Sequence, residues 1–124
     1  HKVDFSREVW RETAKRGVHV VFDTVGESVW PQALRTLGHG GRLVTSGATT
    51  GSRGVTEIRL VFWKQLTIMG STMGTPAEFR QVMRLVFSGS LEPVIHSVMP
   101  LDETRKAHEM LEAGEVFGKI VLVP

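Results

Sequence analysis

Three short runs of small residues are the part of this chain best suited to hold a flat ligand. They read Asp23-Thr24-Val25-Gly26, Thr45-Ser46-Gly47-Ala48 and Gly70-Ser71-Thr72-Met73. Each run follows an apolar stretch typical of a buried strand, and parallel strands bring such ends to one rim of a sheet. Small side chains there let a flat ring approach the backbone. The runs predict either a wall for the nicotinamide half of a dinucleotide or simple loop geometry, which is common in α/β folds.

The glycine-rich loop that usually cradles the phosphates of a dinucleotide is not found in this sequence. Neither GxGxxG nor GxxxxGK[ST] occurs, and Gly38, Gly40 and Gly41 precede a strand rather than follow one. A phosphate cradle needs backbone N–H groups at the start of a helix. We therefore expect these glycines to end a helix and turn the chain.

Other catalytic arrangements receive little support from the residues. The five histidines are scattered without HxxxH or HExxH spacing, and there is no cysteine, so no metal site is expected in this chain. No GxSxG motif occurs either. Asp23 ends a strand, where its carboxylate is expected to bind local backbone N–H groups rather than act as a base. No residue of this chain is predicted to be catalytic.

The elements that must position these runs alternate between helix and strand. Asp4 or Ser6 can cap a first helix that Gly17 ends, Ser28 can cap a second whose first turn holds Pro31, and Thr75 and Glu78 form a capping box. Asp102 can cap the last helix. Helices are expected over residues 4–16, 28–37, 57–65, 75–89 and 102–113, and strands over 18–23, 43–46, 66–72, 93–99 and 118–123, with a loop at 47–54.

This alternation predicts an α/β fold with a parallel sheet and right-handed crossovers. The chain has 124 residues, enough for one compact domain, and its composition is that of a soluble globular protein. Three parallel strands alone would leave an apolar edge unpaired. We therefore expect further structure to precede residue 1 in the complete protein.

Composition and charge also limit the kinds of partner that this chain is expected to bind. The net charge is only +2, without a stripe of lysine and arginine, so binding to nucleic acid is not expected. No apolar run approaches the roughly 20 residues that cross a bilayer, so no membrane segment is expected. The lack of cysteine fits a reducing, cytoplasmic location.

Ordered sequence blocks resemble the medium-chain dehydrogenase/reductase family, in particular its bacterial zinc-type alcohol dehydrogenases and NADPH:quinone oxidoreductases. The blocks are GVHVVFDTVG, ALRTLGHGGRLVTSGATTG, VFWKQ running into LTIMGSTMGT, and EVFGKIVLVP. They cover nearly the whole chain and correspond to the last third of such an enzyme. The resemblance implies the second half of a Rossmann-type doubly wound parallel sheet in residues 1–92. Residues 93–124 would be a C-terminal segment that returns to a catalytic domain outside this chain.

The same resemblance implies roles for nine residues beside NAD or NADP. Thr24 and Val25 would line the ribose region, Ser46, Gly47 and Ala48 would lie beside the nicotinamide, and Ser71, Thr72 and Met73 would meet its carboxamide. Lys119 falls where some relatives hold a basic residue near the ribose or phosphate. Zinc is implied only for parts of the protein outside this chain. The strand at 66–72 resembles the edge through which family members form homodimers.

The expected function is hydride transfer between NAD(P)H and a small-molecule alcohol, aldehyde, enone or quinone, carried out by a longer parent enzyme. The isolated chain is expected to be inactive. Two alternatives stay open at this point: a non-catalytic module that pairs sheets, and the enoyl-reductase part of a multidomain synthase. Cofactor titration distinguishes the non-catalytic module from an oxidoreductase. The sequence upstream of His1 distinguishes the enoyl-reductase part of a synthase from a separate oxidoreductase.

Overall fold

A computed structural model describes residues 4–124 of the chain, which divide into two compact units, residues 4–73 and residues 74–124. Parallel strands alternate with helices in both units, as the sequence predicts. The sequence predicts a different division, into residues 1–92 and a segment 93–124 that would return to a catalytic domain outside this chain. That division stays a prediction. None of the helices among the described residues reaches the length and apolarity needed to cross a bilayer.

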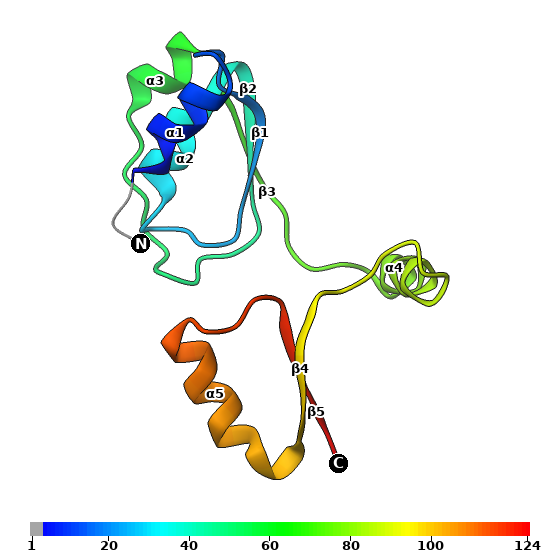
Figure 1. Cartoon of the computed structure of the whole chain (residues 1–124). Coiled ribbons are helices and arrows are strands. Elements are labelled where there is room, and N and C mark those ends of the chain that lie inside the picture. The colour runs from blue at the N-terminus through cyan, green and yellow to red at the C-terminus, as the bar shows by residue number, and fades with distance from the viewer. Residues whose placement is uncertain (1–3) are drawn as a thin grey trace. The chain divides into compact units, whose positions relative to one another are not determined.

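The first unit is a three-stranded parallel sheet in the order β1-β2-β3. Its strands are β1 (Val18–Asp23), β2 (Leu37–Thr45) and β3 (Thr67–Gly70), and its helices are α1 (Phe5–Glu12), α2 (Trp30–Thr36) and α3 (Ile58–Trp63). Figure 1 shows all three helices on the same side of the sheet. The opposite face of the sheet is left uncovered within this unit, and it exposes Val20 and Phe22.

The core of the first unit lies between α2 and the sheet. Ala33, Leu34, Leu37 and Leu43 are almost fully buried, and Leu60 of α3 packs against them. The sequence predicted Ala33, Leu34 and Leu37 as the buried face of one helix, and all three are buried. Leu37, however, is the first residue of β2 rather than part of α2.

Helix α2 ends at Thr36, directly before these glycines, as predicted, but Gly38, Gly40 and Gly41 belong to β2, so the predicted turn is wrong. The pairing explains the difference. Val18 pairs with Leu37 and Val20 with Arg42, so four residues of β2 lie opposite one residue of β1. Gly40 donates its N–H to the carbonyl of Lys64 at 2.7 Å. The glycines form a bulge in a strand, because the bond to Lys64 and the pairing of Leu37 and Arg42 with β1 hold the backbone on either side.

Lys64, which follows α3, fastens the far end of α2. Its ammonium donates to the carbonyls of Arg35 at 3.2 Å and Leu37 at 2.6 Å, which lie at the end of that helix. It also lies 4.7 Å from the centre of the Trp10 ring, on α1. Burial lowers the pKa of Lys64 below its usual value. A single cation thus satisfies helix carbonyls and links all three helices.

Helix starts were predicted with mixed success. Asp4 caps α1 through Ser6 N–H, and Thr75 and Glu78 form the capping box of α4 (Pro76–Phe87). The hydrogen bonds from Thr75 hold the pKa of the Glu78 carboxyl below its usual value. The expected caps Ser28 and Asp102 are wrong, because the helices begin later, after Val29 and Glu103, without a side-chain cap.

The first helix also ends earlier than the sequence suggested. It stops at Glu12, and Ala14 and Lys15 adopt positive φ angles of 48° and 61°. The Thr13 hydroxyl donates to the Val9 carbonyl and accepts from the Gly17 N–H. This local bonding replaces the helical pattern for the last predicted turn.

The second unit pairs two parallel strands, β4 (Ile95–Pro100) and β5 (Lys119–Val123). Between them run a short 3-10 helix, η1 (Leu101–Glu103), and α5 (Thr104–Ala113), which ends at Gly114 in the left-handed conformation. Met99 and Ala107 are its buried apolar residues. Helix α4 precedes these elements in the same unit (Figure 1).

Candidate functional site

The carboxyl ends of β1, β2 and β3 meet in one row, as the sequence predicts. Asp23 pairs with Thr45, and Thr45 pairs with Gly70. The bonding continues one residue beyond each strand, since Ser46 N–H donates to Asp23 C=O and Ser71 N–H donates to Thr45 C=O, both at 2.9 Å. The three small-residue runs therefore leave the sheet side by side.

A pocket of about 470 Å³ opens at this rim of the first unit. It has the size of a small-molecule site. Five of the nine residues predicted from the sequence line it: Ser46, Gly47, Ala48, Ser71 and Thr72. The structure therefore gathers residues from two strand ends around one concave surface.

The other four predicted residues do not line this pocket. Thr24 and Val25 lie on the adjacent turn after β1, where their carbonyls accept hydrogen bonds from Thr49 and Thr50. Met73 is the last residue of the third run and is almost fully exposed. Lys119 begins β5 in the second unit, and its role beside the cofactor stays a prediction.

Asp23 organises the turn between β1 and α2 instead of facing the pocket. Its buried carboxylate accepts the N–H of Val25 at 3.0 Å and that of Gly26 at 3.2 Å. This agrees with the predicted backbone-binding role. The two bonds fix the turn that carries Gly26 into the pocket wall.

The loop at residues 47–54 is fastened onto that turn. The Thr50 hydroxyl donates to Val25 C=O at 2.8 Å and accepts from Ser28 N–H at 3.1 Å. Glu27 N–H donates to Gly51 C=O at 3.1 Å. Because these bonds join residues more than twenty positions apart, they hold the pocket wall as part of the folded unit rather than as a free loop.

Sequence reasoning missed two larger side chains of the pocket, Glu27 and Trp30. The Trp30 indole N–H donates to the Thr56 hydroxyl at 2.9 Å, and Gly54 lies against its ring so closely that a Cβ there would be 2.5 Å from Cδ1. A glycine that faces an aromatic ring across the loop leaves no periodic pattern in the sequence. The only available signal was the tryptophan itself in the first turn of the helix.

Gly47 lies so close to Thr24 that this position of the rim requires a glycine. A Cβ added there would lie 2.7 Å from the Thr24 carbonyl oxygen. Only glycine therefore fits where the second run passes the first. The small residues on either side leave the rim concave, which suits a flat ring lying against the backbone.

The described residues, 4–124, do not fit a metal centre. Within residues 4–124, no group of three histidine, aspartate or glutamate side chains is arranged to hold a metal ion. The polar groups at the rim are hydroxyls and backbone groups, together with the single carboxylate of Glu27. These groups suit hydrogen bonds to an organic ligand better than coordination of zinc.

An open parallel sheet with a pocket of small residues at its strand ends defines one half of a dinucleotide-binding α/β fold. Known proteins agree with this class. The family model described as zinc-binding dehydrogenase matches residues 1–122. The chain belongs to this family, within the medium-chain dehydrogenases/reductases.

Individual relatives support the same assignment. The chain is 30% identical to acryloyl-coenzyme A reductase of Metallosphaera sedula, covering 90% of this chain and 34% of that protein. It is 29% identical to human quinone oxidoreductase, covering 98% of this chain and 39% of that protein. A crystal structure of an NAD-dependent alcohol dehydrogenase superposes with a TM-score of 0.84 at 35% identity, covering all of this chain and 36% of that one. The chain thus spans just over a third of the length of these relatives.

Proposed function

We propose that this chain forms the nicotinamide-side wall of the cofactor cleft in an NAD(P)-dependent oxidoreductase. The observation that carries the proposal is the pocket of small residues where the ends of β2 and β3 meet. Relatives named as an alcohol dehydrogenase, a quinone oxidoreductase and an acryloyl-coenzyme A reductase support the reaction class. The proposed reaction moves a hydride between nicotinamide and an alcohol, aldehyde, enone or quinone.

The cofactor, when bound, supplies the hydride chemistry. The contribution of this chain is positioning. Gly47 lets the backbone approach the ring, and Ser46, Ser71 and Thr72 offer hydroxyls and backbone groups at the rim. The loop held by Thr50 shields one side of the pocket. Such positioning lowers the entropy that the reacting pair must lose.

Filling the pocket tests the proposal. Ser46→Trp adds a large ring at an exposed rim position and should weaken NADH or NADPH binding by about tenfold or more, because the nicotinamide loses its place. The measurement is a fluorescence titration of reduced cofactor in the purified protein that carries this chain. Ser90→Trp, at a serine of the second unit that is also exposed, is the matched control and should leave the affinity within about twofold. Equal affinities for the two variants would place the cofactor elsewhere.

We further propose that catalysis needs more of the protein than these 124 residues. Support comes from the absence of a phosphate loop in the sequence and from the length of the relatives. The isolated chain should therefore show no cofactor-dependent reduction of a quinone or an enone in a spectrophotometric assay at 340 nm. Steady turnover by the isolated chain, above that of a heat-denatured sample, would refute this part of the proposal.

The homodimer implied by the family resemblance is also a proposal. Its support in the structure is the place of β3 at one edge of the sheet, where it pairs only with β2 among the described residues. An edge strand carries backbone groups that a second copy can pair with. The proposed dimer would join two such edges and continue the sheet across both copies.

A further inference from the structure

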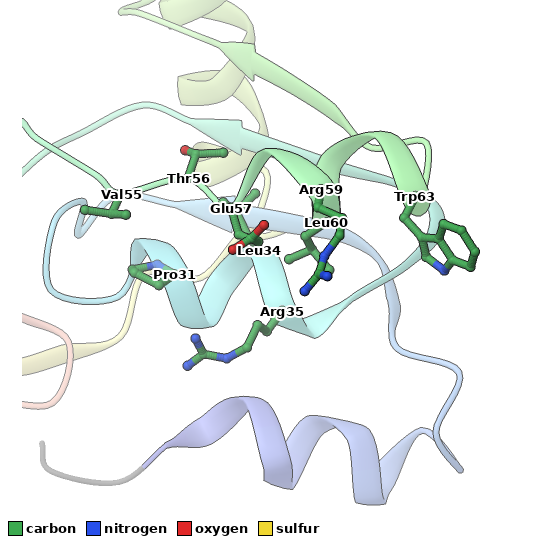
Figure 2. A pocket seen from close by; sticks show the side chains of 9 residues that line it. All are labelled: Pro31, Leu34, Arg35, Val55, Thr56, Glu57, Arg59, Leu60 and Trp63. Atoms are coloured by element: carbon green, nitrogen blue, oxygen red, sulfur yellow. The ribbon is translucent and has the colours of Figure 1, made fainter.

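A second, larger pocket lies in the first unit between α2 and α3, and it shares no lining residue with the rim pocket. Its volume is about 700 Å³, within the range of sites that hold small organic molecules. Figure 2 shows it from close by, with side chains of α2 and α3 and of the segment before α3 around it. The proposed cofactor function makes no use of this pocket.

The inner wall of the pocket is apolar and rigid. Leu34 is 1% exposed and belongs to the core, and Leu60 packs against the same core from α3. Pro31, in the first turn of α2, completes this wall. Because these residues are held by the fold, the wall does not have to be assembled when a ligand binds.

Three charged side chains line the border of the same pocket. Arg35 and Arg59 provide two guanidinium groups, and Glu57 provides one carboxylate. Arg35 already forms an ion pair with a residue distant in the sequence, since its Nη2 lies 3.4 Å from Asp4 Oδ2. Arg59 makes no ion pair or side-chain hydrogen bond with any residue between 4 and 124, and Figure 2 shows its side chain reaching down from α3 beside Leu34. Arg59 is therefore a guanidinium group without an ion-pair partner among residues 4–124, and it lies beside an apolar wall.

We propose that this pocket binds an apolar molecule that carries a single carboxylate. The apolar part lies against Leu34, Leu60 and Pro31, and the carboxylate is held by Arg59. A guanidinium group matches a carboxylate with two parallel N–H···O bonds, and such charge-assisted bonds are stronger than neutral ones. Among the described residues, Arg59 is the one guanidinium group at this border left for a ligand, because Arg35 is paired with Asp4, and a single guanidinium group favours a monoanion over a dianion.

The test uses 4-phenylbutyrate as the probe and 4-phenylbutanol, its neutral analogue, as the comparison. Calorimetric titration of the purified protein that carries this chain should show saturable binding of the carboxylate. The alcohol should bind more weakly by a factor of about ten or more. Arg59→Glu should weaken binding of 4-phenylbutyrate about tenfold or more, since a charge-assisted hydrogen bond is replaced by repulsion. Arg59 has no partner to lose, so the thermal midpoint of the variant should match that of the unchanged protein.

Arg80→Glu is the matched control, because it makes the same charge change on exposed α4 in the other unit. It should leave the affinity for 4-phenylbutyrate within about twofold of the original. Equal weakening by both variants, equal binding of acid and alcohol, or absence of binding would each overturn the proposal. So would competition between 4-phenylbutyrate and NADPH, which would place the probe at the rim. Binding of NADPH, measured alongside, tests the cofactor proposal independently of this one.

Discussion

Leu43→Ala is expected to lower the free energy of unfolding by about 3 kcal/mol, the usual cost of truncating a fully buried leucine. Leu43 is 0% exposed, pairs with Val21 and Ile68 across the sheet, and packs beneath α2. A cavity there removes contacts from the only face of the sheet that this unit covers. Since folded domains are stable by about 5–15 kcal/mol, the loss is a large part of the total. Chemical denaturation followed by circular dichroism measures it.

Phe22→Ala provides the comparison within the same sheet. Phe22 is 66% exposed on the opposite face, so its truncation in the isolated chain should cost less than about 1 kcal/mol. The larger side chain should thus have the smaller effect, which separates burial from residue size. A cost for Phe22→Ala as large as that for Leu43→Ala would contradict the expectation, because it would show that something covers this face in solution.

Gly47→Ala is expected to affect both stability and cofactor binding. The added Cβ would lie 2.7 Å from the Thr24 carbonyl oxygen, closer than real Cβ contacts allow, so the second run must move away from the turn after β1. Overpacking of this kind costs about 1–3 kcal/mol. The displacement also reshapes the wall on which the nicotinamide is proposed to lie. Cofactor affinity should fall about tenfold, as measured by the fluorescence titration described above.

Gly70→Ala is the matched change at the end of β3, in the same row of the sheet. A Cβ at Gly70 meets no atom within 4 Å, so both stability and cofactor affinity should stay close to those of the unchanged protein. If Gly47→Ala proves as mild as Gly70→Ala, the close approach to Thr24 is relieved without cost, and the rim does not depend on glycine at that position.

Local patterns were enough to predict most of the elements and the place of the rim. Strand β1 agrees with its predicted bounds, and the capping box at Thr75 and Glu78 is formed as expected. Both depend on neighbouring residues, which is why the sequence reveals them. The caps expected at Ser28 and Asp102 are wrong, because other residues of the same turns begin the helices. Boundaries of this kind depend on how the chain enters each helix, which tertiary packing decides.

The sequence by itself determined that strands and helices alternate, that small residues follow three apolar strands, and that these runs share one rim, because periodicity and chain order are local properties. The expected burial of all three strands is wrong for β3, whose four residues are all exposed. Only the tertiary structure decided which residues line the pockets. Trp30 and Gly54 meet across twenty-four positions, Lys64 holds the glycine bulge of β2, and α2 and α3 enclose the second pocket. Contacts between residues so distant in the chain form only when the sheet and its helices pack together, and no short pattern encodes them.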